Sequence, residues 1–530
     1  MKQKIKLLSI ALLTLFFTQA CEKTTEPDTT PLQVSISAPV NNETVKDTVS
    51  IIATVADNDG VSKVDFLIDG VSIGTVTKSP FQIEWDTKQS SNGVHNLQCK
   101  AVDNSGNETL SEIVKVTVAN YLFKATFKNN WLPSDAGEAV IFISDMDGNL
   151  LAERTWTGND SFELFADNGI KDDITEISVT TVVKYGSQTA FITTNMNVPV
   201  GSSWTWEGRT SQADYDNPYN VEFNFQNMPE HQGFVLSSKW NSHISNSDTL
   251  SSSFSYNFYE SPMDIYLKLN TVNNGVKYAW INNVVPGSRQ DDLSNMLNAS
   301  KHTINLQGSS YGYHKNLYGI PNPGRRYEGI YRLDYGRDNE NTVNSIDVYF
   351  PESSFSDYRT SIYFYDDYNS RDYWYQSTYG AIPDNFTKIS ADFNFISGTY
   401  DNFEISTSGD EFLEIRTFWH DENYYNHWEV YCDKSTVKYK LPNLPNSAIQ
   451  LFSSLDRESF RLSSTDLIDH SELNSYQEIL NILFNSNEYF YDVVNDIRSR
   501  TKYYDNGGYA KQNENRLEFE ELYENTYLIR

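Results

Sequence analysis

The feature that most constrains the fold is a strict alternation of apolar and polar residues between residues 32 and 118. Short runs such as 64–68 and 97–101 carry an apolar side chain at every second position. A period of two puts those side chains on one face of a β-strand. Turn residues separate the runs, as at Asn58-Asp59-Gly60 and Asn104-Ser105-Gly106. About seven short strands within about ninety residues predict a two-layer β-sandwich over 32–119.

Five motifs occur in order within this segment. They are Ala38-Pro39, VSIIATVAD at 49–57, VDFLIDG at 64–70, FQIEWDT at 81–87 and AVDNSGN at 101–107. Together they resemble the bacterial Ig-like repeats of surface and secreted proteins, over about a sixth of the chain. The resemblance implies an Ig-like sandwich that serves as a spacer or accessory domain.

The first 21 residues have the layout of an export signal. Three lysines precede an apolar run at 7–17, which is too short to span a bilayer as a stable helix. The run ends at Thr18-Gln19-Ala20-Cys21, and the whole resembles a bacterial lipoprotein signal peptide. The resemblance implies lipidation of Cys21, for example with palmitate, and attachment to the cell envelope as an outer membrane lipoprotein. Thr18 stands where such signals usually carry Leu, so an ordinary secretory signal is the alternative.

Aromatic residues set the structural class. The 530 residues include 35 Tyr, 29 Phe and 10 Trp against 6 Met. Aromatic and β-branched residues favour strands, whereas Asn, Asp, Ser and Gly favour turns. At about 150 residues per domain the chain is expected to form three or four units. We predict a mainly β, multidomain protein of β-sandwiches, the first of them Ig-like, with a short helical C-terminal segment.

Charge and cysteine content limit the partners and the cross-links. The formal net charge is -30, and a field of this sign repels nucleic acid and anionic lipid headgroups. The membrane is therefore expected as a partner only through the lipid anchor. Cys99 and Cys432 lie in different predicted domains, so we expect two buried thiols and no disulfide framework.

Composition and turn signals divide the remaining chain. Two pairs of strand-like runs, 139–145 with 149–155 and 175–184 with 189–196, predict hairpins. The predicted division is a signal peptide at 1–21, a polar tether at 22–31, the Ig-like sandwich at 32–119, a β-sandwich at 120–210, one or more β-rich domains at 211–450, and a partly helical segment at 451–530.

An Asn shortly before a Pro recurs along the β-rich part, at Asn197, Asn227, Asn283 and Asn443. Because Pro lacks the N–H that strand pairing needs, each occurrence predicts the end of a strand. The spacing is uneven, and we interpret the recurrence as repeated turn chemistry, not as a repeat array.

The C-terminal segment changes period. Residues 471–484 place apolar side chains at helical spacing after a capping residue, either Asp469 or Ser471. Residues 488–498 have a similar stripe. Two helices packed on the preceding sheet are therefore predicted.

The densest aromatic cluster predicts a ligand-binding site. Residues 363–375 form a predicted hairpin with Tyr363 and Tyr365 on one face and Phe364 on the other. Exposed rings beside charged groups would suit a sugar, whereas buried rings would indicate cross-strand packing. The candidate residues are Tyr363, Tyr365, Arg371, Tyr373, Trp374 and Tyr375.

Metal sites have weaker support. His420 and His427 are suitable ligands in kind, but their spacing fits no standard pattern and the segment reads as a hairpin of 414–419 with 428–432. Asp145-Met146-Asp147-Gly148-Asn149 and Asp57-Asn58-Asp59 lack the sixth-position Gly and the bidentate Glu of an EF-hand. We predict no cofactor and leave calcium open at these two loops.

No nucleophile elbow, metalloprotease helix or phosphate loop occurs in the sequence, which lowers the case for an enzyme without removing it. The leading hypothesis is a lipid-anchored envelope protein whose Ig-like spacer presents a β-rich binding or adhesion head to an extracellular glycan or protein. The alternatives are a surface polysaccharide hydrolase with an Ig-like accessory domain, which needs a pair of carboxylates, and a purely structural envelope spacer.

Overall fold

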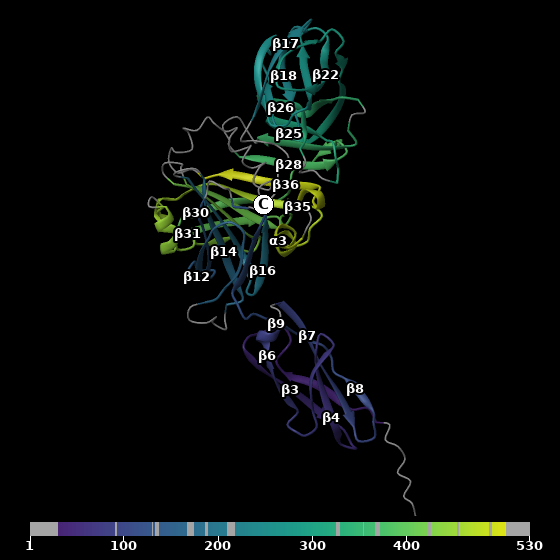
Figure 1. Ribbon diagram of the computed structural model, residues 1–530, viewed down its shortest axis with the longest axis vertical. Coiled ribbons are helices and arrows are strands. Elements are labelled where there is room, and N and C mark those ends of the chain that lie inside the picture. The colour runs from purple at the N-terminus through teal and green to yellow at the C-terminus, as the bar shows by residue number, and fades with distance from the viewer. Residues whose placement is uncertain are drawn as a thin grey trace, which may run out of the picture. The chain divides into compact units, whose positions relative to one another are not determined.

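The computed structural model describes residues 30–90, 93–129, 131–132, 137–166, 174–185, 189–208, 218–324, 329–352, 355–365, 372–421, 426–452, 455–486 and 490–504. These residues are mostly strand, which confirms the predicted mainly β class (Figure 1). The chain divides into two compact units, Met1–Asn120 and Tyr121–Arg530. The predicted signal peptide and Cys21 lie outside the described residues. Among those described, no helix has the length and hydropathy needed to cross a bilayer.

The first unit is a two-sheet sandwich. One sheet has the strand order β1-β3-β6, and the other has the order β2-β9-β7-β4-β5 with β8 added to β7. A 3-10 turn, η1 (Thr87–Gln89), follows β6. The strands are β1 (Gln33–Ala38), β2 (Glu43–Val45), β3 (Thr48–Ala56), β4 (Val61–Ile68), β5 (Val71–Val76), β6 (Gln82–Asp86), β7 (Gly93–Asp103), β8 (Glu108–Leu110) and β9 (Val114–Val118).

The predicted alternation fills the core of this sandwich. Val64, Phe66, Leu97 and Cys99 are all fully buried, and they alternate with outward side chains along β4 and β7. Cys99 is a free thiol in this core, and burial raises its pKa to about 12. Cys432, in the second unit, is also free and buried. The prediction of two buried thiols is confirmed.

The second unit begins with two sandwich modules in tandem. The first module has the sheets β13-β10-β16 and β12-β11-β14-β15, and the second has β20-β17-β23 and β19-β18-β21-β22-β24. The first module consists of β10 (Phe123–Lys128), β11 (Ala139–Ser144), β12 (Leu150–Trp156), β13 (Asp160–Leu164), β14 (Glu176–Tyr185), β15 (Thr189–Pro199) and β16 (Ser202–Glu207). The second consists of β17 (Tyr219–Gln226), β18 (His231–Ser237), β19 (Ser242–Ser245), β20 (Ser253–Phe258), β21 (Met263–Thr271), β22 (Gly275–Val284), β23 (Gly287–Asp292) and β24 (Leu297–Asn298). Both hairpins predicted from the sequence, β11 with β12 and β14 with β15, are confirmed.

The two modules share one topology, strand for strand. In each, the first and the seventh strands pair in parallel. In each, the first strand ends at an Asn with positive φ, Asn129 at 52° and Asn227 at 54°. Its amide donates to a carboxylate on the last residue of the seventh strand, at 2.7 Å to Glu207 and 2.9 Å to Asp292. Asn has this conformation more readily than most residues, so the recurrence of Asn in the sequence marks a structural repeat as well as turn chemistry.

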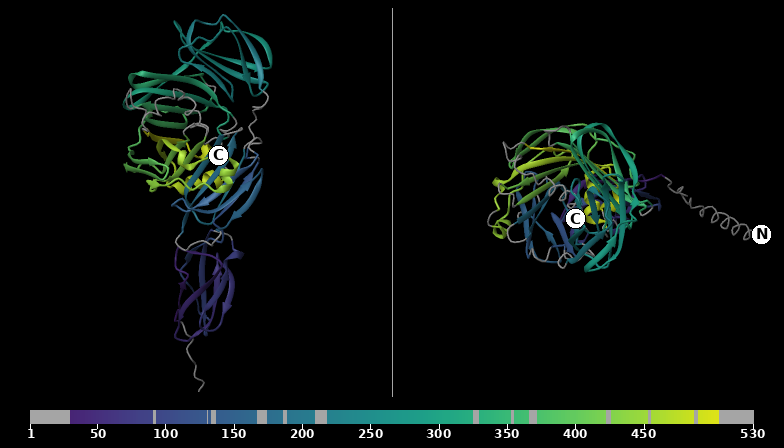
Figure 2. Two further views of the ribbon diagram at one scale, coloured as in Figure 1. Left: turned by 90° about the vertical axis from the view of Figure 1, so that its left-hand side faces the viewer. Right: turned by 90° about the horizontal axis from the view of Figure 1, so that it is seen from above.

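A single 13-stranded sheet organises the rest of the second unit. Its order is β12-β11-β14-β15-β33-β32-β35-β36-β28-β27-β25-β26, with β29 beside β25. Figure 2 shows the blue strands of the first module beside the yellow-green strands of the C-terminal part, as the parallel pairing of β15 with β33 requires. The later strands are β25 (Ser300–Ile320), β26 (Tyr331–Phe350), β27 (Asp357–Tyr365), β28 (Tyr373–Gly380), β29 (Asn385–Phe386), β32 (Glu414–His420), β33 (His427–Asp433), β35 (Arg461–His470) and β36 (Asp496–Tyr503).

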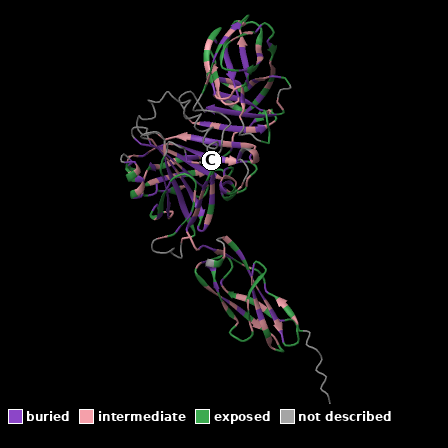
Figure 3. Cartoon of the chain, in the orientation of Figure 1, coloured by how far each residue is buried: buried purple, intermediate pink, exposed green. Residues whose placement is uncertain are grey.

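One face of this sheet is apolar. Trp419, Trp428 and Ile192 point to it and are almost fully buried. A small sheet of β30 (Asp392–Thr399), β31 (Asn402–Ser408) and β34 (Lys438–Tyr439) supplies further core residues to the same cluster. Figure 3 shows that burial continues along most strands of this unit. Because strands alternate, the opposite face carries a different set of side chains.

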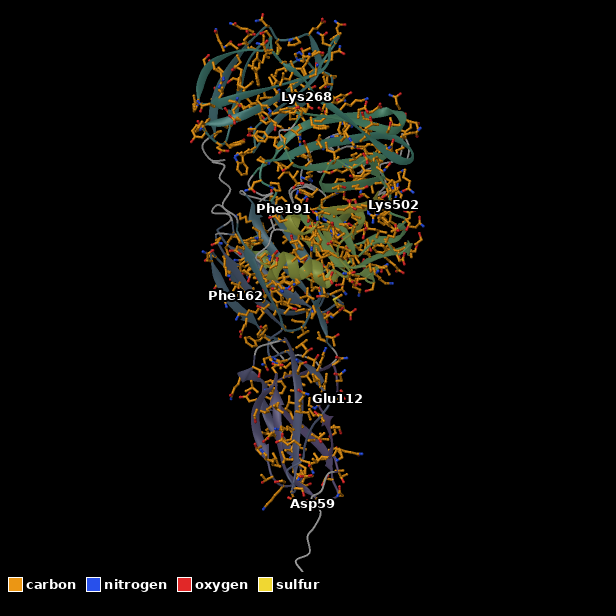
Figure 4. The ribbon with its side chains drawn as sticks, turned by 90° about the vertical axis from the view of Figure 1, so that its right-hand side faces the viewer. Asp59, Glu112, Phe162, Phe191, Lys268 and Lys502 are labelled. Atoms are coloured by element: carbon orange, nitrogen blue, oxygen red, sulfur yellow. The ribbon has the colours of Figure 1, made fainter. Side chains whose placement is uncertain are left out.

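A buried ion cluster joins the second module to the 13-stranded sheet. Asp334 on β26 accepts from Lys268 on β21, which Figure 4 labels, and from Lys315 on β25 at 2.6 Å. The backbone N–H groups of Tyr335 and Tyr349 each donate to the same carboxylate at 3.0 Å. Burial alone would raise the pKa of Asp334. The two ammonium groups together outweigh burial and bring the pKa below its usual value, so the carboxylate is ionised. Burial lowers the pKa of Lys268.

The C-terminal helices confirm one prediction and correct another. The α-helices among the described residues are α2 (Asn446–Leu451), α3 (Tyr476–Asn485) and α4 (Phe490–Val493), and a 3-10 turn, η3 (Arg457–Ser459), precedes β35. Helix α3 lies in the predicted segment, although its cap is Ser475, whose side chain accepts from the Glu478 N–H. The second predicted helix, 488–498, is wrong beyond α4. Residues from 496 onward form β36, because pairing with β35 and β28 outweighs a weak local helical pattern.

Candidate functional site

The candidate site lies on the face of the 13-stranded sheet opposite the tryptophans, which we call the polar face. It is defined by Glu414, Arg416 and Phe418 of β32, which alternate with the inward residues of the same strand. β33 and β35 flank β32 in antiparallel register. Side chains directly opposite each other on paired strands have Cβ atoms about 5 Å apart. Rows of side chains therefore run across the polar face from strand to strand.

Arg416 is the centre of the charged row. Its register partners are Tyr431 on β33 and Asp466 on β35, and Thr501 on β36 continues the row. Arg416 is fully buried, and its Nη2 lies 3.1 Å from Oε2 of Glu429. The Tyr431 hydroxyl donates to the same Glu429 oxygen. The guanidinium also lies over the rings of Phe418 and Tyr431, at 4.2 and 5.0 Å.

Asp466 is the most perturbed carboxyl of this face. It is fully buried, and burial raises its pKa to about 7. Arg416 and the Thr501 hydroxyl oppose the shift, while the carboxylates of Glu429 and Glu414 add to it. A carboxyl that exchanges its proton near neutral pH, in a cluster of charged groups, is a feature that often marks a functional site.

A second buried pair lies one row further along. His470 Nε2 is 3.3 Å from Glu414 Oε2, and both side chains are almost fully buried. The ring of Phe490 in α4 packs edge-on against His470, with centroids 5.4 Å apart. The pair is closed from solvent and serves to fix β32 against β35.

The polar face is half-exposed along one row. Across β15, β33, β32, β35 and β36 the register aligns Thr193, Glu429, Phe418, Ser464 and Tyr503. All but Ser464 are half-buried. We call these five residues the open row.

A stacked ring pair borders the open row on its first two strands. Phe191, labelled in Figure 4, stacks on His427 with centroids 5.2 Å apart and an interplanar angle of 28°. Both rings are half-buried. Partly exposed rings next to a carboxylate held by Arg416 can pack on the C–H face of a sugar while the carboxylate accepts from its hydroxyls.

The aromatic residues predicted from the sequence lie on the same sheet but beneath the surface. Tyr363, Tyr365, Tyr373 and Tyr375 are between 1% and 7% exposed and form one cluster, against which Phe418 and Tyr503 of the open row pack. The predicted hairpin and its alternation are confirmed, since Phe364 points to the other face. Burial leaves these four rings without a face for a sugar, which favours the packing interpretation.

Two other residues were predicted together with these rings. Trp374 points to the opposite face, where Arg500 lies 4.5 Å above its ring. Arg371 lies outside the described residues. A ligand-binding role for this set stays a prediction.

The predicted metal candidates are neighbours in the sheet. His420 and His427 are direct register partners at the end of the hairpin of β32 and β33. Burial lowers the pKa of both rings, and the His420 Nδ1–H donates to the Asp421 carbonyl at 3.0 Å. Within the described residues no group of three or more His, Cys, Asp or Glu has the geometry to hold a metal ion.

The two loops left open for calcium use their carboxylates locally. Asp145 accepts from the backbone N–H of Asp147 at 3.1 Å and from that of Asn149 at 2.8 Å. Asp57 accepts from the Asp59 N–H at 2.7 Å. These contacts are turn chemistry, and calcium at either loop stays a prediction.

The sequence analysis did not identify Arg416, Glu429 or Asp466. A signal was present, since Glu414 and Arg416 stand two residues apart, on either side of Ile415, inside a predicted strand. Alternation of this kind shows that one face of the strand is polar. It does not show which distant strands bring further polar residues to that face.

Comparison with known proteins identifies the first unit. Residues 33–98 match the family model of the bacterial Ig domain, which confirms the Ig-like interpretation of that segment. Domains of this kind are typical of surface or exported proteins. No curated protein sequence matches the chain.

Several solved structures align with parts of the chain at low TM-scores. Fibronectin(III)-like modules of Clostridium thermocellum CbhA share 30% identity over 16% of this chain and 94% of theirs, with a TM-score of 0.16. The endo-beta-1,4-mannanase from Thermotoga petrophila shares 19% identity over 18% of this chain and 21% of its own, with a TM-score of 0.15. Bacteroides ovatus SGBP-B, solved with a mixed-linkage heptasaccharide, shares 14% identity over 62% of this chain and 93% of its own, with a TM-score of 0.17. TM-scores this low do not establish a shared fold over the aligned lengths, so the bacterial Ig domain is the family match that these comparisons establish.

Proposed function

We propose that this is a lipid-anchored cell-envelope protein that binds an extracellular glycan on the open row of its second unit. In this proposal Cys21 carries the lipid, the Ig-like unit is a spacer, and the 13-stranded sheet carries the binding site. The observation that supports it most is the set of half-buried rings beside the Glu429 carboxylate, in the middle of a sheet.

The position of the open row within the sheet favours a glycan over an extended peptide. The five strands that form it are all interior strands, hydrogen-bonded on both sides. A peptide that binds by adding a strand needs a free sheet edge. A ligand on the open row must instead be recognised through side chains, and rings with a carboxylate suit a sugar.

The hydrolase alternative has less support. It needs two carboxyl groups that both reach the substrate. Of the three carboxyl groups grouped on the polar face, Glu414 and Asp466 are almost completely buried, whereas 17% of the Glu429 side chain is exposed. One accessible carboxylate fits binding better than hydrolysis.

The structural spacer is the other alternative, and it needs no ligand. Burial of Tyr363, Tyr365, Tyr373 and Tyr375 favours it.

A panel of immobilised plant and microbial polysaccharides, probed with the full mature chain, tests glycan binding. Retention on at least one polysaccharide is expected. Phe165 on the same unit is 56% exposed and lies off the open row, so Phe165→Leu should bind as wild type does. Loss of binding in Phe418→Leu but not in Phe165→Leu would place the ligand on the open row. If no polysaccharide retains the protein, the proposal fails and the structural spacer is favoured.

The anchor has its own test. Cells that express the protein and grow with labelled palmitate should incorporate the label, and Cys21→Ser should abolish the incorporation while the protein is still exported. Export without any label in the wild type would support the ordinary secretory signal instead.

A further inference from the structure

We infer that the ligand of the open row is an uncharged linear glycan that lies across the strands and occupies about four sugar units. The inference rests on the proposed function, and it adds the direction, the length and the charge class of the ligand.

The direction follows from the register. Thr193, Glu429, Phe418, Ser464 and Tyr503 are successive cross-strand neighbours, so the line that joins them is perpendicular to the strands. Along β32, the middle strand of the five, the exposure by contrast ends quickly. On β32 the next polar-face residues on either side of Phe418, which are Arg416 and His420, are buried. An extended ligand that contacts Phe418 can therefore follow the row but cannot run along β32.

The length follows from the strand spacing. Five strands have four gaps of about 4.8 Å, which gives a row about 19 Å long. A pyranose unit in an extended glycan advances by roughly one strand spacing, so each gap accommodates about one sugar. Rings occur on the first two strands through Phe191 and His427, on the third through Phe418 and on the fifth through Tyr503.

The charge class follows from the groups that face the row. Arg416 is buried and pairs with Glu429, so its guanidinium is not available to a ligand. Burial lowers the pKa of His427, which keeps its ring neutral at neutral pH. The chain as a whole has a net charge of -30. An acidic polysaccharide would be repelled by this charge, whereas neutral hydroxyls can donate to Glu429.

Oligosaccharides of defined length test the inference. The probes are neutral cellulose-, xylan- and mannan-derived oligosaccharides of two, four and six units, and acidic polygalacturonate oligosaccharides of the same lengths, titrated into the full mature chain by calorimetry. For at least one neutral series, affinity should rise at least tenfold from two to four units and stay level from four to six, while the acidic series should not bind.

Variants at Tyr503, the last residue of the open row, and at Phe191, which borders its first strand, assign the subsites. Tyr503→Leu and Phe191→Leu should each reduce affinity for the four-unit ligand by about tenfold, because each removes one ring that packs on a sugar. Each should leave affinity for the two-unit ligand less affected than Phe418→Leu does. Phe165→Leu is the matched control and should have no effect.

The outcomes separate the inference from the proposed function. If no glycan binds, neutral or acidic, both fail. If a neutral glycan binds with equal affinity at two and six units, if the row variants have no effect, or if the acidic series binds as well, the proposed function stands and the inference is overturned.

Discussion

Replacement of Asp466 by Asn should make the second unit more stable at alkaline pH and leave it almost unchanged at acidic pH. Asp466 is fully buried between Arg416 and Thr501, and burial raises its pKa from 3.8 to about 7. Between pH 4 and pH 7, therefore, Asp466 keeps its proton in the folded state but has lost it in the unfolded state. Asn has nearly the same shape and no charge to bury.

The sign and the size of the effect follow from proton linkage. Between the two pKa values the folded state binds more protons than the unfolded state, so the free energy of unfolding falls as pH rises. The slope is about 1.4 kcal/mol per pH unit, and the fall ends near pH 7, where the folded carboxyl itself ionises. At pH 8 the accumulated cost in the wild type is roughly 4 kcal/mol, and Asp466→Asn removes it.

Urea unfolding, followed through tryptophan fluorescence at pH 4.5, 6 and 8, measures this difference. The midpoint of the second unit should fall with pH in the wild type and fall much less in Asp466→Asn. Asp410→Asn, at an exposed position, is the control for a change of net charge and should follow the wild type. An Asp466→Asn midpoint that tracks the wild type at all three pH values would refute the reasoning. It would mean that Arg416 compensates the buried carboxylate in full.

Three further predictions concern the rest of the chain. Asp334→Asn leaves two buried ammonium groups without a counter-ion and should cost about 3–5 kcal/mol in urea unfolding, whereas Lys268→Met leaves one balanced pair and should cost clearly less. Equal costs would contradict the ionised cluster. The thiols of Cys99 and Cys432, whose pKa values burial raises, should react with a disulfide reagent at pH 8 only after denaturant is added; fast reaction in buffer would show that the cores open. Asn227→Gly keeps the φ of 54° and loses only the hydrogen bond to Asp292, so it should lower the melting temperature less than Asn227→Val, which loses the same hydrogen bond and is also strained at this φ. Similar melting temperatures of the two variants would show that the left-handed turn is not required.

Local patterns predicted the elements that close over short distances. The alternation at 64–68 and 97–101 predicted two core strands of the first unit, and the hairpin that ends at His420 and His427 followed from its own residues. In each case the partner strand lies nearby in sequence or the buried face is set by period two. Such features depend on backbone geometry and burial, and the local sequence pattern indicates both.

The open row could not be predicted in the same way. Its first strand, β15, lies more than two hundred residues before β33 in the sequence, and the parallel pairing of the two strands sets which side chains face Phe418. Register between distant strands depends on how whole sheets assemble. The same limit applies to Tyr363. The sequence correctly placed Tyr363 and Phe364 on opposite faces of their strand. Only assembly of the sheet decides that the face with Tyr363 is covered.

The repeat within the second unit supplies a natural control for the open row. Asn197 and Asn283 lie near the C-terminal ends of the equivalent strands β15 and β22, with φ values of 55° and 53°. Counting back from them, Phe191 and Thr193 of β15 correspond to Lys277 and Ala279 of β22. β15 pairs with β33, whereas β22 is joined at Lys277 by the short strand β24. The second module therefore shows that the topology tolerates Lys and Ala at these positions.

The double variant Phe191→Lys, Thr193→Ala transfers that pair into the first module. We expect it to keep its far-ultraviolet circular dichroism and to melt within a few degrees of the wild type, because the equivalent strand accommodates both residues in the same topology. Affinity for a four-unit neutral glycan should fall by more than tenfold, since one ring and one hydroxyl leave the row and a cation enters it. The reciprocal variant, Lys277→Phe with Ala279→Thr, should gain no binding, because β22 has no neighbours equivalent to Glu429, Phe418 and Tyr503. If the reciprocal variant gained affinity, an isolated ring pair would be sufficient and the row across five strands would not be the site.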